Sequence, residues 1–226
     1  MSWHVRSRAA ALAVGLVLVL AGGGILGYGL YQRLSTQQTV AARGQQNVDA
    51  VNQWLQGAPS ASPPTSAPAA SSTSPPAAGS GCGGGSDSQA YALVEFTGLP
   101  QYGYAAVSVN GNWSLLDNRD MVHWYASPAP GGTGNVIIAF HREPNFEYID
   151  QLSAGDTITI QDRSCNSYVY TVTNFWTLSP SQVTQLVPTS GHLLTMITCT
   201  PWWQDYDRLV WRADLTSVDG TPVPSS

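Results

Sequence analysis

Short stretches rich in β-branched and aromatic residues recur between residues 91 and 215, and they constrain the fold of this chain more than any other feature. Gly, Pro, Asn and Asp separate them, which is typical of strands joined by turns. Seven strands are predicted: Tyr91–Phe96, Ala105–Val109, Val136–His141, Thr157–Asp162, Tyr168–Asn174, Leu193–Cys199 and Leu209–Leu215. Many short strands favour an all-β barrel or sandwich, and about 125 residues are enough for a single core.

Two further elements are expected between these strands. Residues 112–124 show no clear alternation of apolar and polar residues, but an eighth strand could lie within them. The run Ser179-Pro180-Ser181-Gln182 places a serine cap, a proline in the first turn and a glutamine three residues after the cap, ahead of an apolar run over residues 183–187. This combination predicts the start of a short helix.

The composition changes before the first strand. Residues 57–90 are almost entirely Ala, Ser, Pro, Gly and Thr, and such a segment cannot bury enough apolar surface to order itself. We expect a disordered linker with a root-mean-square reach of about 30 Å if it behaves as a Gly/Ser coil. Ahead of it, Val48, Val51 and Leu55 with polar residues between them predict a juxtamembrane helix within residues 33–56.

An uncharged apolar segment covers residues 9–32. At about 1.5 Å per residue it is long enough to cross a bilayer of about 30 Å as a helix. Arg6 and Arg8 precede it, so residues 1–8 are expected to form a cytoplasmic tail, although arginines also follow the segment and weaken this bias. A cleaved signal peptide is the alternative, but its apolar core would be only about 7 to 15 residues. We expect an uncleaved, single-pass anchor in the cell membrane, with the rest of the chain extracytoplasmic.

Three cysteines are present, so no disulfide scheme uses all of them. If Cys199 stays free, Cys82 and Cys165 are the one intramolecular pair left. Cys82 lies in a Gly-rich run that would have to be fixed against the domain, at an entropic cost. Two free thiols are therefore favoured over the Cys82–Cys165 pair.

The charged residues indicate which kinds of binding partner are expected. The formal net charge is −5, and this weakly acidic balance argues against nucleic acid as a partner. Glu143, Glu147 and Asp150 form a group of carboxylates, but their spacing fits no EF-hand loop, and solvated loop residues are the favoured interpretation. No metal or other cofactor is expected.

Cys199 ends an apolar, β-branched run, because the following Thr200-Pro201 cannot continue a sheet ladder. A thiol at a strand end can meet a substrate, whereas a thiol buried within a strand is a small hydrophobic group. His141 ends another apolar run, and Arg208 begins a third. A thiol, an imidazole and a guanidinium are the nucleophile, acid/base and oxyanion donor that a thiol acyltransferase needs.

The residues around these three resemble motifs of the sortase family. Thr195-Met196-Ile197-Thr198-Cys199 is similar to the Thr-Leu-x-Thr-Cys motif, with Met in place of Leu. Gly134-Asn135-Val136-Ile137-Ile138-Ala139-Phe140-His141-Arg142 is similar to Gly-Asn-x-x-ϕ-ϕ-Gly-His-Arg, with Phe140 in place of a small residue. Arg208 follows Cys199 by nine positions, a spacing most like that of class E. The resemblance covers residues 91–215.

This resemblance implies an eight-stranded β-barrel with one or two short helices over residues 91–216, followed by a C-terminal tail at 217–226. It implies a cysteine transpeptidase that cleaves a sorting signal similar to Leu-Pro-x-Thr-Gly, or Leu-Ala-x-Thr-Gly for class E, after the threonine. The acyl group would form a thioester with Cys199 and pass to an amine of a cell-wall precursor or a pilin lysine. The partners would be secreted proteins that carry the signal. His141 would be the acid/base, and Arg208 the oxyanion donor.

Further candidates for substrate binding lie near these residues in the sequence: His123, Phe140, Thr198, Trp202 and Trp203. For His123 a packing role is at least as well favoured, and for the two tryptophans packing and pocket roles are equally favoured. His192 is disfavoured as the acid/base because it begins the strand that Cys199 ends, seven residues away. Arg212 is the other candidate for the oxyanion donor, and the spacing to Cys199 favours Arg208.

One other function remains open at this point, and a further one is disfavoured. The open alternative is a non-catalytic β-barrel that displays a binding surface on its tether, in which case Cys199 should be inert toward an electrophile. An L,D-transpeptidase also needs Cys, His and Arg, but its Ser-His-Gly-Cys motif is absent from the sequence.

Overall fold

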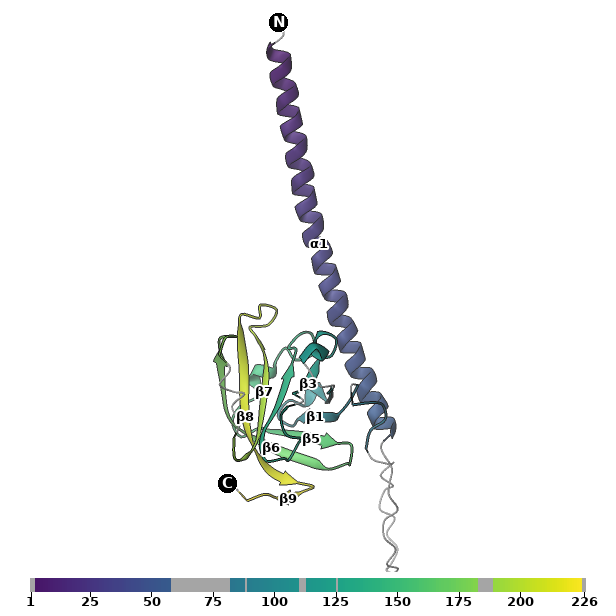
Figure 1. The fold of residues 1–226 in the computed structure, drawn as a ribbon, viewed down its shortest axis with the longest axis vertical. Helices are drawn as coiled ribbons and strands as arrows, with labels where there is room; N and C mark the ends of the chain where they lie inside the picture. The colour runs from purple at the N-terminus through teal and green to yellow at the C-terminus, as the bar shows by residue number, and fades with distance from the viewer. Residues whose placement is uncertain are drawn as a thin grey trace, which may run out of the picture. The chain divides into compact units, whose positions relative to one another are not determined.

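The structure is a computed structural model that describes residues 3–57, 82–87, 89–109, 113–124, 126–182 and 189–224 (Figure 1). In the first helix, side chains are described from residue 19 onward. The chain divides into two compact units, Met1–Ala42 and Arg43–Ser226, and each is considered by itself.

A single helix, α1 (Trp3–Gly57), forms the described part of the first unit and continues into the second. The predicted membrane segment at residues 9–32 is helical within it. Among the described residues, no helix is both long and apolar enough to span a membrane. The structure therefore does not support the predicted transmembrane helix.

The second unit is built on one sheet of nine strands (Figure 1). Eight of them are hydrogen-bonded neighbours in the order β2-β1-β5-β6-β8-β7-β4-β3, and the ninth pairs with β8 outside this path. The strands are β1 (Ala92–Phe96), β2 (Tyr104–Val107), β3 (Met121–His123), β4 (Gly134–Phe140), β5 (Thr157–Asp162), β6 (Ser167–Leu178), β7 (His192–Thr200), β8 (Asp207–Val218) and β9 (Thr221–Pro222). Short 3-10 helices lie between them: η1 (Pro100–Tyr102), η2 (Trp113–Asp117) and η3 (Ile149–Gln151).

All seven predicted strands are present, and β3 is the eighth strand expected within residues 112–124. The two ends of the eight-strand path nearly meet, because Ser108, after β2, forms a bridge with Val122 of β3. The predicted all-β barrel is therefore confirmed as a nearly closed, eight-stranded barrel. The helix predicted from Ser179 begins as a turn, in which Gln182 N donates to Ser179 O at 2.9 Å. Residues 183–188, which would form its body, lie outside the described residues.

Alternation along the strands separates the barrel interior from its outer face. Leu194 and Met196 of β7 are buried in the core, as are Leu209 and Trp211 of β8. In β4 the corresponding inward residues are Val136, Ile138 and Phe140. Successive side chains of a strand point to opposite faces, so the residues between these project from the outer face.

The last part of α1 packs against the barrel of the second unit. Trp54 is fully buried, and its Nε1 donates to Gln161 Oε1 of β5 at 3.2 Å. Asn47 Oδ1 accepts a hydrogen bond from Ala106 N of β2 at 3.3 Å. Trp54 also belongs to a small hydrophobic cluster, separate from the main core, whose buried members are Ala50, Trp54, Cys82, Ala90, Leu93 and Ala106.

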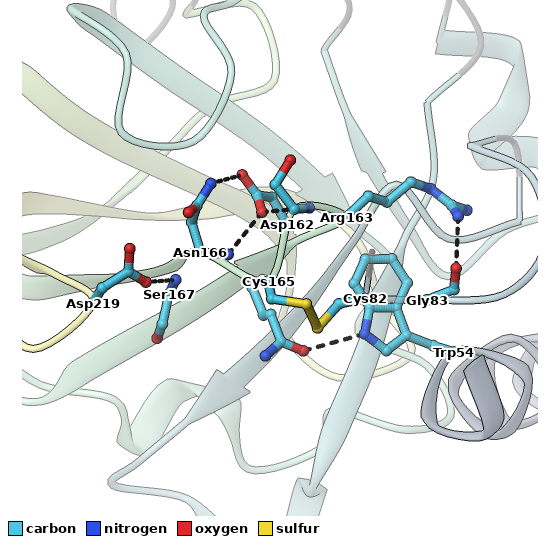
Figure 2. Close-up of a disulfide and its surroundings, with 11 residues drawn as sticks. Trp54, Cys82, Gly83, Asp162, Arg163, Cys165, Asn166, Ser167 and Asp219 are labelled. Carbon is cyan, nitrogen blue, oxygen red and sulfur yellow. Dashed lines mark hydrogen bonds between the residues drawn. A yellow bond between two sulfur atoms is a disulfide. The ribbon is translucent and has the colours of Figure 1, made fainter. Parts of the chain in front are cut away.

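Cys82 and Cys165 form a disulfide with a Cα–Cα distance of 4.9 Å (Figure 2). The prediction of two free thiols is therefore wrong. The cause is local packing: Gly83 adopts φ +91°, and a Cβ there would lie 2.5 Å from Trp54 Cε3, so only a glycine fits against the indole. Contacts with Trp54 fix this Gly-rich run, which its composition alone would leave mobile.

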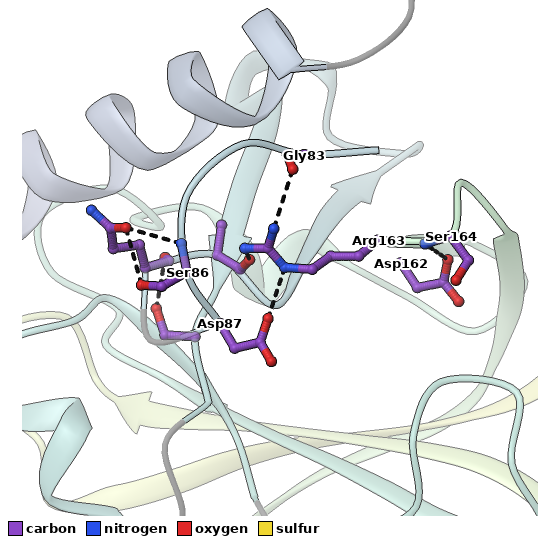
Figure 3. A network of polar contacts seen from close by, with 9 residues as sticks. Gly83, Ser86, Asp87, Asp162, Arg163 and Ser164 are labelled. Atoms are coloured by element: carbon purple, nitrogen blue, oxygen red, sulfur yellow. Dashed lines mark hydrogen bonds and ion pairs between the residues drawn. The ribbon is translucent and has the colours of Figure 1, made fainter. Parts of the chain in front are cut away.

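Arg163 adds polar contacts to the same segment. Its Nη1 donates to Gly83 O at 3.2 Å, and its Nε pairs with Asp87 Oδ1 at 2.8 Å (Figure 3). The guanidinium also lies 5.3 Å from the centre of the Trp54 ring, within reach of a cation–π interaction. Residues on both sides of the segment 58–81 thus pack in one cluster, while the segment itself, which holds most of the predicted linker, lies outside the described residues.

Candidate active site

Cys199 and Arg208 face each other across two adjacent strands. β7 and β8 are antiparallel, and their register pairs Cys199 with Arg208 and Thr198 with Leu209. Residues directly opposite in an antiparallel pair project on the same side, with Cβ atoms about 4.5–5.5 Å apart. The thiol and the guanidinium therefore share one face at one end of the barrel.

His141 reaches the same place from the other side of β7. β4 is parallel to β7, and Ala139 pairs with Ile197. Thr198 Oγ1 donates to Phe140 O at 2.7 Å, which keeps the strands together beyond the last ladder pair. The same register continued by two residues places His141 level with Cys199. The three residues thus lie at one end of three adjacent strands, β4, β7 and β8.

These three residues also share the outer face of the sheet. Phe140, Thr198 and Leu209, their chain neighbours, are 2%, 2% and 6% exposed and point inward. A strand alternates faces at every residue, so the imidazole, the thiol and the guanidinium project outward.

The His141 ring is held by a backbone carbonyl. Its Nε2 lies 2.7 Å from Leu116 O in η2, and because a carbonyl only accepts, Nε2 carries the proton. Burial lowers the pKa of His141, the bond to Leu116 O opposes this, and the nearby cation Arg43 lowers it further. The carboxylates of Asp205 and Asp117 raise it. The net effect favours a neutral imidazole that leaves Nδ1 as the proton acceptor.

Cys199 is the free cysteine of the chain's three and is partly buried. Burial raises the pKa of its thiol, and Arg208 lowers it. Asp205 and Glu143 raise it again, since a negative charge disfavours a thiolate. The raised pKa favours the protonated thiol over the thiolate.

The loop between β7 and β8 borders the thiol and holds Arg208. Arg208 Nη1 donates to Asp205 O at 3.1 Å and to Asp207 O at 3.0 Å. Trp203 N donates to Glu143 Oε1 at 2.8 Å, which connects the loop to the segment after β4. Trp203 is 50% exposed and stacks edge-on with Trp202 at 5.6 Å between ring centres. Both tryptophans thus lie on the loop next to Cys199.

The other predicted substrate-binding residues have buried side chains. Phe140 packs in the core with Phe146 at 5.3 Å and with Trp211 at 6.2 Å between ring centres. Thr198 bonds the Phe140 carbonyl. His123 pairs with the inward residue Ile138, and its Nε2 lies 2.9 Å from Pro128 O. All three side chains are buried, and alternation puts them on the face opposite to Cys199, so their substrate-binding role stays a prediction.

The two rivals named from the sequence lie away from the thiol. His192 is at the other end of β7, where it pairs with Gly134. Arg212 pairs with Thr195, four residues along the strands from the Cys199–Arg208 pair. At about 3.3 Å per residue, that separation is about 13 Å.

Sequence reasoning did not single out Arg142, which connects the site to the barrel. It is 4% exposed, donates from Nη1 to Thr200 Oγ1 at 3.0 Å and pairs with Asp150 at 2.8 Å. Its position directly after His141 in the motif was the available signal. Asp205 and Arg43, which act on the pKa of His141, were also missed, since neither belongs to a motif.

The chain matches the family model described as a sortase domain over residues 99–216. Among solved structures it is similar to the sortase D5 transpeptidase of Clostridium perfringens, with 26% identity over 57% of this chain and 79% of that chain and a TM-score of 0.50. It is also similar to sortase A from Corynebacterium diphtheriae, with 23% identity over 58% of this chain and 62% of that chain and a TM-score of 0.51. A third similar structure is a pilus-related sortase C of Group B Streptococcus, with 21% identity over 57% of this chain and 68% of that chain and a TM-score of 0.50.

The latter two show a common fold, and a search of curated proteins finds no match. The similar structures belong to several sortase classes, so class E remains a prediction from the spacing of Cys199 and Arg208. With the family domain covering just over half of the chain and the barrel in place, this chain belongs to the sortase family of cysteine transpeptidases.

Proposed function

We propose that this sortase cleaves a sorting signal similar to Leu-Pro-x-Thr-Gly or Leu-Ala-x-Thr-Gly after the threonine. It then transfers the acyl group to a primary amine of a cell-wall precursor or a pilin lysine. The observation that carries the proposal is the placement of His141, Cys199 and Arg208 on one face, at one end of three adjacent strands. A nucleophile, a proton carrier and a fixed cation are thereby gathered around one reacting carbonyl.

In the first half-reaction, Cys199 Sγ attacks the threonine carbonyl carbon and its proton passes to His141. The carbonyl oxygen gains negative charge, which Arg208 stabilises. The C–N bond then breaks, the leaving amine takes the proton from His141, and a thioester remains on Cys199. The acceptor amine attacks the thioester carbonyl carbon, and His141 takes a proton from it. The C–S bond breaks as the new amide forms, and the proton passes from His141 to the Cys199 sulfur, which regenerates the thiol.

Arg208 is held in position for this role. Its hydrogen bonds to Asp205 O of the loop and to Asp207 O of β8 both come from Nη1. A guanidinium has further N–H donors on Nε and Nη2 in the same plane, so these can serve the oxyanion while Nη1 keeps the plane in place. An oxyanion donor that is oriented in advance needs no reorganisation during the reaction.

We place the barrel outside the cytoplasm, attached to the cell membrane through residues 9–32 with the N-terminus in the cytoplasm. The Cys82–Cys165 disulfide supports the extracytoplasmic part of this proposal, since structural disulfides form in oxidising compartments. The apolar, uncharged sequence of residues 9–32 supports the anchor. Fractionation of cells with protease protection of the barrel tests both parts.

The experiment that tests the reaction uses the full chain with a panel of fluorogenic Leu-Pro-x-Thr-Gly and Leu-Ala-x-Thr-Gly peptides, plus glycine or lysine amines, and follows the products by mass spectrometry. A threonyl-amine product that is absent with Cys199→Ala supports the proposal and ranks the two motifs. Intact transpeptidation by Cys199→Ala would overturn it. A Cys199 that resists electrophiles in the folded protein, with no thioester from any peptide, would favour a binding module.

A further inference from the structure

The backbone ladder between β4 and β7 ends before it reaches the reactive groups. Among the described residues, its last pair is Ala139 with Ile197, two positions before His141 and Cys199. Beyond this pair the regular hydrogen bonds of the sheet no longer set the distance between the two chain segments. Side-chain contacts must therefore determine how far the imidazole lies from the thiol.

Arg142, directly after His141, makes the first connection across this gap. Its Nη1 donates at 3.0 Å to the hydroxyl of Thr200, the last residue of β7. The rest of the guanidinium is held on the β4 side: Nε and Nη2 donate to Glu147 O at 3.2 and 2.7 Å, and Nη2 pairs with Asp150 at 2.8 Å. The side chain is only 4% exposed, so its Nη1 is a donor with a fixed direction.

Glu143 makes the second connection. It is 6% exposed, and its Oε1 accepts a hydrogen bond from Trp203 N, in the loop between β7 and β8, at 2.8 Å. A charged acceptor makes a stronger bond than a neutral one. Trp203 adopts a φ of 61°, a left-handed conformation that is rare for a bulky residue and persists only where the surroundings impose it. The Glu143 carboxylate is such a contact.

The two connections reach the chain just beyond the thiol. Thr200 directly follows Cys199, and Trp203 follows it by four positions. The same loop holds Arg208, whose Nη1 donates to Asp205 O, so the connections also bear on the oxyanion donor. Catalysis depends steeply on geometry, and a misplacement of about 1 Å can lower a rate about 10²-fold.

We propose that Arg142 and Glu143 are positioning residues of the active site. Their side chains hold the end of β7 and the loop after it against the segment after β4, and they thereby set the separation of His141 from Cys199. The consequence for catalysis rests on the proposed function, but the separation of the two groups does not.

The first test measures this separation in the full chain without a substrate. The short reagent 1,3-dibromoacetone alkylates Cys199 Sγ and then a nitrogen of His141 if the ring lies within its reach, and each step releases bromide and a proton. Peptide mapping by mass spectrometry gives the fraction of alkylated Cys199 that is also joined to His141. The wild-type protein should cross-link.

Two pairs of variants break and restore the connections one at a time. Thr200→Val removes the acceptor of Arg142 but keeps the shape of the side chain, and it should lower the cross-linked fraction about 10-fold. Thr200→Ser keeps the hydroxyl and should cross-link as the wild type does. Glu143→Ala should lower the fraction likewise, and Glu143→Gln, whose amide oxygen can accept from Trp203 N, should restore it.

Thr216→Val is the matched control. Thr216 lies at the other end of β8, eight residues from Arg208 and about 26 Å along the strand. Its hydroxyl also bonds a neighbouring strand, since it lies 3.2 Å from Thr171 Oγ1, and the loss of this contact should leave the cross-link unchanged. Wild-type cross-linking in both Thr200→Val and Glu143→Ala, no cross-link in the wild type, or an equal loss in Thr216→Val would overturn the proposal.

The second test is steady-state kinetics with the best peptide, on variants shown by thermal unfolding to be folded at the assay temperature. Thr200→Val and Glu143→Ala should lower kcat about 10²-fold with little change in KM, because the reacting groups are displaced while substrate binding is kept. Thr200→Ser and Glu143→Gln should recover kcat, and a wild-type kcat in Thr200→Val would overturn the catalytic role. If the wild type turns over no peptide, the proposed function fails, while the cross-link still decides whether these side chains set the separation.

Discussion

Cys199 and Arg208 are direct partners in the antiparallel ladder of β7 and β8. The loop of residues 201–206 returns the chain so that a nine-residue spacing in the sequence becomes a cross-strand pair. The ladder hydrogen bonds on both sides keep the guanidinium next to the thiol.

Arg208→Lys should lower kcat by about 10²-fold or more, because a lysine keeps the charge but loses the planar set of donors that an oxyanion needs. The measurement is steady-state kinetics with a fluorogenic peptide. Arg212→Lys on the same strand is the control and should change kcat little. Wild-type kcat in Arg208→Lys would exclude an oxyanion role that depends on the guanidinium.

Asp205→Asn should shift the alkylation of Cys199 by iodoacetamide to lower pH. The Asp205 carboxylate raises the pKa of the thiol, so its removal makes the thiolate easier to form. The rate of alkylation is followed against pH by mass spectrometry. Asp207→Asn serves as the neighbouring control, and a curve for Asp205→Asn that stays in place or moves upward would contradict the electrostatic assignment.

Reduction of the Cys82–Cys165 disulfide should destabilise the second unit by about 2–5 kcal/mol. The free energy of unfolding is measured in urea with and without dithiothreitol. The double variant Cys82→Ser/Cys165→Ser should be equally destabilised and should no longer respond to the reductant. A wild-type protein whose stability ignores the reductant would show that the bond contributes nothing.

Trp54→Ala should cost about 3–5 kcal/mol of stability, since it removes a fully buried indole of the hydrophobic cluster. Leu55→Ala is the matched control, because this adjacent side chain is 47% exposed and should cost little. Thermal unfolding compares the two variants. Equal melting temperatures for both would mean that the end of α1 does not stabilise the barrel.

A shortened chain that begins at residue 91 should be less stable than one that begins at residue 43. It lacks Trp54, Cys82 and the segment 82–90 that Arg163 binds. Urea unfolding of the two chains checks this, with Cys165 left as a free thiol in the shorter one. Equal stability would return the domain boundary to residue 91, where the sequence predicts it.

The barrel could be predicted because alternation and turn residues are local. The inward residues of β4, β7 and β8 repeat at every second position, and the residues that separate the strands belong to turns. The candidate residues His141, Cys199 and Arg208 also carry local signals, because each lies at the end of an apolar run. The motif makes Phe140 a candidate for substrate binding, whereas the structure packs it inside the barrel beside Trp211.

The sequence by itself determined the strands and the three candidate reactive groups, since each depends on neighbours within a few residues. The tertiary structure decided which residues far apart in the sequence contact each other. The Cys82–Cys165 bond joins residues 83 positions apart, and it forms because Trp54 and Arg163 fix a Gly-rich run that has no order of its own. Such contacts depend on which surfaces bury each other, and no local pattern encodes that choice.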